Sequence, residues 1–157
     1  MTATSPAPAT ARDPIGLGLL LAGAALAVVV AFALPALHFR GADSSLLGIS
    51  AWEAVPWLTK LKIGFLALAI AAAFLPSLAR LRLPLILAAA VMMLLPSVGA
   101  LVASVYQWSD VRAEIVQIAG VRKPWIDPGW GVLALFAAAM MVLGAFWRTW
   151  RTAAANA

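Results

Sequence analysis

Two apolar runs joined by a short basic link decide the fold: residues 63–106 read IGFLALAIAAAFLPSLARLRLPLILAAAVMMLLPSVGALVASVY. The runs 63–79 and 83–106 contain no Asp, Glu, Lys, Arg or His, and only Arg80-Leu81-Arg82 separates them. About 20 apolar residues cross a bilayer as a helix, and lipid offers no partner for an unpaired backbone group. We therefore expect two antiparallel membrane-spanning helices that lie side by side.

Two further runs, 15–37 and 129–147, are equally free of ionisable side chains. Only 11% of the residues are charged and 64% are hydrophobic, whereas soluble domains carry about 25% charged residues. The prediction is an all-α integral membrane protein, a four-transmembrane-helix bundle. The run 63–79 is the shortest, and it gains length if its helix begins near Pro56, with Lys60 and Lys62 reaching up to the headgroups.

The rest of the chain is assigned by composition. Residues 1–14 are small, polar and Pro-rich, which predicts a disordered N-terminal tail; residues 15–151 form a single membrane domain, and 152–157 a disordered C-terminal tail. A cleaved signal peptide is the alternative for the N-terminal region, with Arg12 before the apolar run and Ala31-x-Ala33 near its end.

Prolines and capping residues mark the predicted helix ends and one kink. Pro84 suits the first turn of the third helix, Asp127-Pro128 reads as cap and first turn of the fourth, and Pro96 predicts a helix kink. In the long connection between these helices, Ser109 as N-cap and Gly120 as terminator predict a short amphipathic helix. We expect it to lie at the membrane interface, or alternatively against the loop 38–56.

Charge and aromatic residues give an orientation. The short link with Arg80 and Arg82 and the basic C-terminal end favour both termini on the cytoplasmic side of a bacterial inner membrane, although the Lys/Arg totals on the two sides nearly tie. Aromatic residues flank the runs and predict an aromatic belt at both interfaces, with an aromatic-lined binding site as the alternative: Trp52, Trp57, Tyr106, Trp108, Trp125, Trp130, Trp147 and Trp150.

The sequence offers little for catalysis, and we expect no enzyme. There is no cysteine, which excludes thiolate chemistry, and the apolar runs contain only Ser77, Ser97 and Ser104 as polar residues besides termini. His38 is the only histidine, so neither a metal site nor a bis-ligated haem is expected, and no cofactor is assigned. The net charge of +5 comes without a basic tract, so no nucleic acid is expected as a partner.

One loop and one helix face are the candidate contact sites. Residues 122–131 (RKPWIDPGWG) combine cations and indoles beside a helix start, which suits a ligand or lipid headgroup, or a stiff turn: Arg122, Lys123, Trp125, Asp127 and Trp130. Small residues in the first helix suit close packing against other membrane protein subunits, in a homo- or hetero-oligomer, or packing inside the bundle: Gly16, Gly18, Ala22, Gly23 and Ala27.

Leu34-Pro35, followed by Gly48-Ile49-Ser50-Ala51-Trp52-Glu53 before the second helix, resembles small four-span membrane proteins of bacteria; the likeness implies topology and no activity. From the apolar helices and small faces we expect a non-catalytic membrane subunit or scaffold, accessory to a larger complex. The alternative is a protein that binds or transports a small molecule, a lipid or a quinone-like ligand held between helices, near Pro96 and the loop 122–131.

Overall fold

The computed structural model describes residues 13–40, 46–120 and 124–155. Four long helices make up most of it: α1 (Pro14–Ala33), α3 (Pro56–Phe74), α4 (Arg82–Tyr106) and α6 (Trp130–Ala155). A short 3-10 helix, η1 (Pro76–Leu81), joins α3 to α4. All four long helices are long and apolar enough to cross a bilayer, so the chain is a helical membrane protein with four candidate spans, as the sequence predicts.

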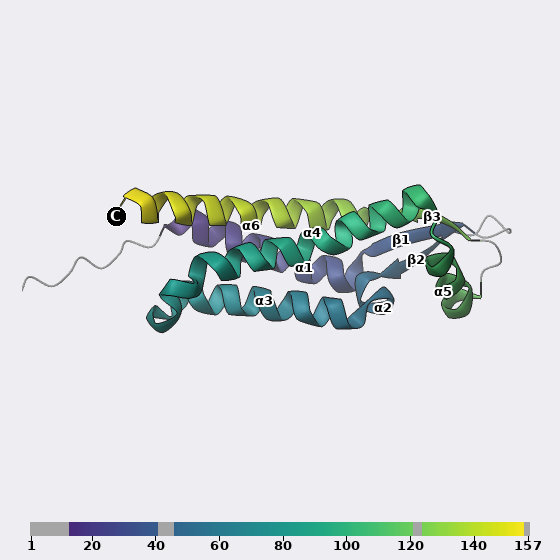
Figure 1. Cartoon of the computed structure of the whole chain (residues 1–157), viewed down its shortest axis with the longest axis horizontal. Coiled ribbons are helices and arrows are strands. Elements are labelled where there is room, and N and C mark those ends of the chain that lie inside the picture. Colours follow the sequence, from purple (N-terminus) through teal and green to yellow (C-terminus); the bar gives the residue numbers. More distant parts are fainter. Residues whose placement is uncertain (1–12, 41–45, 121–123, 156–157) are drawn as a thin grey trace, which may run out of the picture.

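The helices lie along one axis and alternate in direction, so the molecule has two distinct ends (Figure 1). At one, which we call the terminal end, α1 begins, α6 ends and η1 makes its turn (Figure 1). The other, the sheet end, carries a small β-sheet and the short helices α2 (Ala51–Ala54) and α5 (Ser109–Ala119) (Figure 1). The antiparallel neighbours predicted on either side of Arg80 and Arg82 are confirmed.

The sheet was not expected from the sequence. Its antiparallel strands have the order β2-β1-β3, with β1 (Pro35–Arg40) between β2 (Leu46–Ser50) and β3 (Trp125–Pro128). Phe39, Ile49 and Ile126 are buried in its own small core. Two predictions are therefore wrong: the first apolar run leaves helix after Ala33, and Asp127-Pro128 is strand rather than the cap of α6.

Proline and glycine explain both departures. The residue before a proline avoids helical backbone angles, and Leu34 is extended where it precedes Pro35. At the start of α6, a Cβ at Gly129 or Gly131 would collide with the carbonyl oxygen of Pro35, so only glycine lets the two chain segments approach. The amide of Gly129 donates to the carbonyl of Ala36 at 3.0 Å, which fixes the strand beside the helix.

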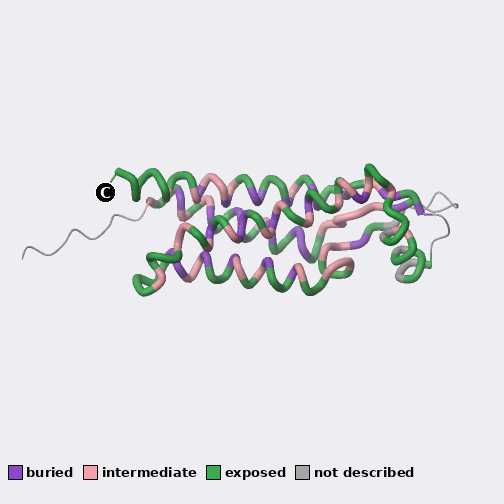
Figure 2. Tube along the Cα trace, viewed as in Figure 1, coloured by how far each residue is buried: buried purple, intermediate pink, exposed green. Residues whose placement is uncertain are grey.

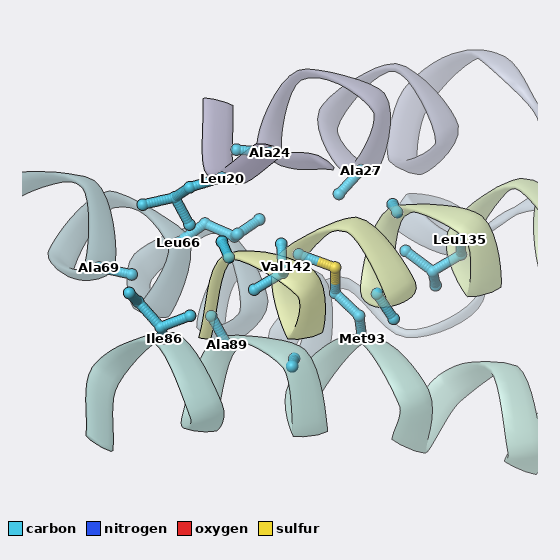
Figure 3. Close-up of a cluster of buried hydrophobic side chains, with 14 of the residues drawn as sticks. Leu20, Ala24, Ala27, Leu66, Ala69, Ile86, Ala89, Met93, Leu135 and Val142 are labelled. Atoms are coloured by element: carbon cyan, nitrogen blue, oxygen red, sulfur yellow. The ribbon is translucent and has the colours of Figure 1, made fainter. Parts of the chain in front are cut away.

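The bundle core is built mainly from small residues. Buried residues lie mainly on the facing sides of the helices, and exposed residues mainly on the outward sides (Figure 2). Ala24 and Ala27 of α1, Ala69 of α3 and Ala89 of α4 pack with larger side chains such as Met93 (Figure 3). Small side chains bring helix backbones close, and in a bilayer that close packing replaces the hydrophobic drive between helices.

Several helix boundaries differ from those predicted. α5 forms at the residues where a short helix was expected, and Gly120, whose φ of 66° suits glycine, is its C-cap. Its N-cap is Trp108 and no side chain caps it, so the assignment of Ser109 as N-cap is wrong. At the terminal end Asp13 caps α1 and α6 continues to Ala155, so residues 13 and 14 and most of 152–157 are not tails. The remaining tail residues lie outside the described part of the chain.

Candidate ligand-binding site

A cavity of about 290 Å³ opens between α3 and α4 near the sheet end. Its walls come from the first turns of α3 and the second half of α4, and it is closed by the sheet, by α2 and by the start of α5. Leu37 and Ile49 of the sheet, Leu58 of α3 and Ala103 of α4 give it an apolar surface. Ligand pockets of about 300–1,000 Å³ with apolar walls and a few polar groups are typical of small-molecule sites.

Lys62 is the unusual residue of this cavity. Its side chain is only 1% exposed, although lysine is almost never fully buried without a partner. Within the described part of the chain, no ion pair or hydrogen bond engages its ammonium group. The expectation that Lys62 reaches the headgroups is wrong, whereas Lys60 is exposed and its Nζ lies 5.6 Å from the ring centroid of Trp52.

Helical spacing puts Lys62 inside. Thr59, Lys62, Leu66 and Ala69 recur every three or four residues of α3, and all four are buried. α3 begins at Pro56, as predicted, so this face enters the bundle within the first two turns. The sequence thus contained the signal for a buried lysine, because the apolar face of the helix extends through position 62.

The other polar groups of the cavity leave Lys62 without a counter-charge. The hydroxyl of Thr59 donates to the carbonyl of Ala51 at 3.0 Å, which ties α3 to α2. Glu114 of α5 is the one acidic residue among the described lining residues; it is exposed and forms no ion pair with Lys62. The cavity therefore combines an apolar body, one buried cation and an exposed carboxylate.

Hydrogen bonds hold the wall formed by α5 against the sheet. Gln107, between α4 and α5, adopts a left-handed backbone with φ 49° and ψ 47°. Its side-chain amide donates to the carbonyl of Ile126 at 2.7 Å, and its oxygen accepts from the amide of Ile126 at 3.0 Å. Arg112 also donates to the carbonyl of Pro124 at 2.9 Å. These contacts fix Trp108, which lines the cavity.

Pro96 lies in the cavity wall. α4 passes through it as a continuous helix, and the predicted kink stays a prediction. Proline has no N–H, so the carbonyl of Met92 loses its usual helical donor. The next residue, Ser97, is buried and donates its hydroxyl to the carbonyl of Met93 at 3.1 Å. The alternative interpretation of the sequence placed a ligand near Pro96, and this residue lines the cavity.

The predicted contact loop does not take part in this cavity. Arg122 and Lys123 lie outside the described residues. Trp125 and Trp130 are exposed, 57% and 70%, and Asp127 pairs with Arg40 at 3.2 Å across the β1–β3 ladder. Of the described members of this group, none lines the cavity, and Asp127 has a structural partner.

The small-residue face of α1 divides between inside and outside. Gly16, Gly23 and Ala27 are buried within the bundle. A Cβ at Gly23 would lie 2.9 Å from both the carbonyl oxygen of Ala138 and Cγ2 of Val142, so this glycine is an internal packing site against α6. Gly18 and Ala22 are exposed, and a Cβ at Gly18 would meet no atom within 4 Å.

The remaining candidates are placed without forming a reactive site. His38 lies in the central strand, where it pairs with Gly48 and Asp127. Among the described residues no group of three metal-ligating side chains comes together. Every tryptophan named in the predicted belt is exposed to some degree, and Trp147 and Trp150 contact each other with ring centroids 5.2 Å apart.

Comparisons of the chain with protein-family models, with curated proteins and with solved structures found no match.

Proposed function

We propose that this membrane protein binds a small, largely apolar molecule in the cavity between α3 and α4, and that it is not an enzyme. The observation that carries the proposal is Lys62, a cation 1% exposed beside an apolar cavity and without a partner among the described residues. Ionisable side chains within membrane helices are rare and generally face a functional cavity. A bound molecule would fill the space and compensate the charge.

Two glycines offer a matched test of the cavity. A Cβ at Gly99 or at Gly64 would meet no atom within 4 Å, and both residues are exposed, but only Gly99 lines the cavity. Native mass spectrometry of the mildly solubilised protein should find a stoichiometric small molecule. Gly99→Leu should lower its occupancy, and Gly64→Leu should leave it unchanged. Wild-type protein that carries no small molecule, and binds none added, would refute the proposal.

The location follows from the same proposal. We place the protein in a bacterial inner membrane with both termini cytoplasmic and α5 along the opposite membrane surface. The supporting features are the Arg residues at the terminal end, Arg80, Arg148 and Arg151, and the amphipathic sequence of α5. The chain has no cysteine, so single cysteines are clean reporters. In intact cells an impermeant thiol reagent should label Ser109→Cys and not Ala155→Cys; the reverse pattern would invert the orientation.

A second candidate function, an accessory subunit of a membrane complex, is favoured by one observation. Gly18 and Ala22 form an exposed small-residue pair one helical turn apart, and a helix of another chain can approach such a surface closely. Crosslinking in native membranes should then trap a partner on wild-type protein and lose it with Gly18→Leu. A wild-type chain that crosslinks to no other protein would remove this candidate.

A further inference from the structure

We propose that the molecule bound in this cavity is an amphipathic carboxylic acid whose carboxylate pairs with Lys62. The inference rests on the proposed function and names the chemical class of its ligand. It follows from the position of Lys62, the polarity of the surrounding wall and the parts of the wall that face outward.

A charged Lys62 is stabilised best by an anion, and neither ion pair of the described residues involves it. An ammonium group moved from water into an apolar interior loses several kcal/mol of solvation unless an opposite charge or hydrogen bonds replace the water. The hydroxyl of Thr59, one turn away, donates to the carbonyl of Ala51 and carries no charge to balance that of the ammonium group. An anionic ligand supplies both an opposite charge and hydrogen-bond acceptors, whereas a neutral ligand supplies acceptors at most and a cationic ligand adds repulsion.

The charge balance of the lining favours a carboxylate over a phosphate. Lys62 is the only basic residue among the described lining residues, and Glu114 is the only acidic one. A carboxylate neutralises Lys62 and leaves only the exposed Glu114 without an opposite charge. A phosphate monoester carries about −1.5 to −2 charges at pH 7, so it would add an uncompensated charge to a site that already contains Glu114.

The rest of the ligand lies against hydrocarbon. Leu37, Ile49 and Leu58 line the cavity, as does Pro96, so an alkyl or cyclic body is accommodated without unpaired polar groups. The cavity also reaches the outside of the bundle, because Leu95 and Gly99 of α4 both line it and are exposed. An acid already dissolved in the bilayer can therefore reach Lys62 without crossing water.

Four probes with the same ten-carbon chain separate charge from hydrophobicity: decanoate, decyl phosphate, 1-decanol and decylamine. The full-length protein is titrated with each in an uncharged detergent, and the rise in the unfolding midpoint gives the affinity, because a ligand that binds only the folded state stabilises it. Decanoate should bind tightest, about tenfold or more above 1-decanol, a difference that corresponds to about 1.4 kcal/mol. Decylamine should bind weakest.

Two lysines two residues apart provide the matched variants. Lys62→Met should weaken the affinity for decanoate by about 30-fold or more, because the anion loses its desolvated partner. The affinity for 1-decanol should change by no more than about twofold. Lys60→Met, at the exposed lysine, should retain the wild-type preference. Lys62→Arg should retain the preference for acids, which shows that any loss in Lys62→Met arises from charge rather than misfolding.

The outcomes distinguish this inference from the proposed function. Equal binding of decanoate and 1-decanol, or an acid preference that survives Lys62→Met, overturns the carboxylate assignment and leaves the cavity a ligand site. Decyl phosphate binding more tightly than decanoate overturns it in favour of a phosphate. If none of the four probes binds, the inference fails; the proposed function falls as well only if the purified protein carries no other small molecule.

Discussion

The helix pairs α1–α6 and α3–α4 are both antiparallel, but they differ in how closely they pack and in whether their charges are paired. Between α1 and α6, Gly23 lies against the backbone of Ala138, and Asp13 forms an ion pair with Arg148 at 2.7 Å where α1 begins. Between α3 and α4 a cavity of about 290 Å³ remains near the sheet end, and Lys62 there has no described partner.

The α1–α6 contact is optimised for stability, and the α3–α4 contact is not. Close packing and a paired charge are what a membrane helix pair needs for stability alone. An unfilled cavity and an uncompensated cation both reduce stability, and departures of this kind from local consistency are expected at functional sites. We therefore expect ligand binding at α3–α4 and a structural role for the contact between α1 and α6.

The largest expected effect tests the closeness of the α1–α6 contact. Gly23→Leu should lower the free energy of unfolding by about 3 kcal/mol, at the upper end of typical overpacking costs. The reason is that even a Cβ would stand 2.9 Å from the carbonyl oxygen of Ala138, and backbone cannot yield as a flexible side chain does. The measurement is reversible unfolding of the purified protein in mixed micelles, together with its yield in the membrane.

Gly18→Leu is the matched control on the same helix. A Cβ at Gly18 meets no atom within 4 Å, so the monomer should be unaffected. Equal destabilisation by the two substitutions would show that the difference between the inner and outer glycines of α1 is not real. The same pair separates stability from assembly, because loss of a crosslinked partner in Gly18→Leu alone would point to the exposed face.

A smaller effect of opposite sign is expected at α3–α4. In ligand-depleted protein, Lys62→Met should raise the free energy of unfolding by about 1–3 kcal/mol, because replacing buried charge by an apolar side chain of similar length is often stabilising. Added decanoate should reduce the difference in free energy of unfolding between the variant and the wild type, because it stabilises the wild type preferentially. The measurement is the same unfolding titration with and without decanoate.

Lys60→Met is the control for that substitution. Lys60 is exposed beside Trp52, and such contacts contribute about 0.5–1 kcal/mol at exposed sites, so its replacement should be slightly destabilising. If Lys62→Met instead lowered the free energy of unfolding, the charge of Lys62 would already have a partner within the protein. The two helix pairs would then differ in packing and not in charge pairing.

The sequence predicts the bundle well because the bilayer restricts the possible structures, and long runs without ionisable residues must be helices. The link between the second and third runs was placed too late: α3 ends at Phe74, before Pro76, and the connection is the 3-10 helix Pro76–Leu81. The sheet was missed because hydropathy alone does not separate an apolar strand from the end of a helix: Pro35–Leu37 continues the run that begins in α1. Its strands pair residues far apart in the chain, such as His38 with Asp127, and no local pattern reveals that pairing.

The candidate site was only partly predictable. The alternative interpretation placed a ligand near both Pro96 and the loop 122–131; Pro96 lies in the cavity wall, and the described residues of the loop lie elsewhere. Lys62 was assigned to the membrane surface because lysines near helix ends usually extend outward. Its spacing of three residues from Thr59 and four from Leu66 places it instead on the buried face of α3. For Gln107, which has a left-handed backbone and whose side-chain amide bonds to the sheet at Ile126, the sequence offers no local signal.

The smallest expected effect concerns the paired charge at the terminal end. The hydrogen bond from Arg148 lowers the pKa of Asp13, with help from the backbone amides of Gly16 and Ile15. A carboxyl with a depressed folded pKa contributes stability above its unfolded pKa of about 3.9, and the contribution is lost as the pH falls through the folded value. Asp13→Asn should therefore be slightly less stable than wild type at pH 7, and the difference should vanish in acid.

Asparagine is a good helix N-cap, so this substitution removes the charge and retains the cap that Asp13 provides to the amide of Ile15. Arg148→Gln should remove most of the same pH dependence, and Arg151→Gln, at an exposed arginine three residues further along α6, should not. Unfolding midpoints measured between pH 7 and the acid limit of the protein give the comparison. If Asp13→Asn instead matched the wild type at every pH, Asp13 would act through its cap alone, and α1 and α6 would be held together by packing rather than by their paired charge.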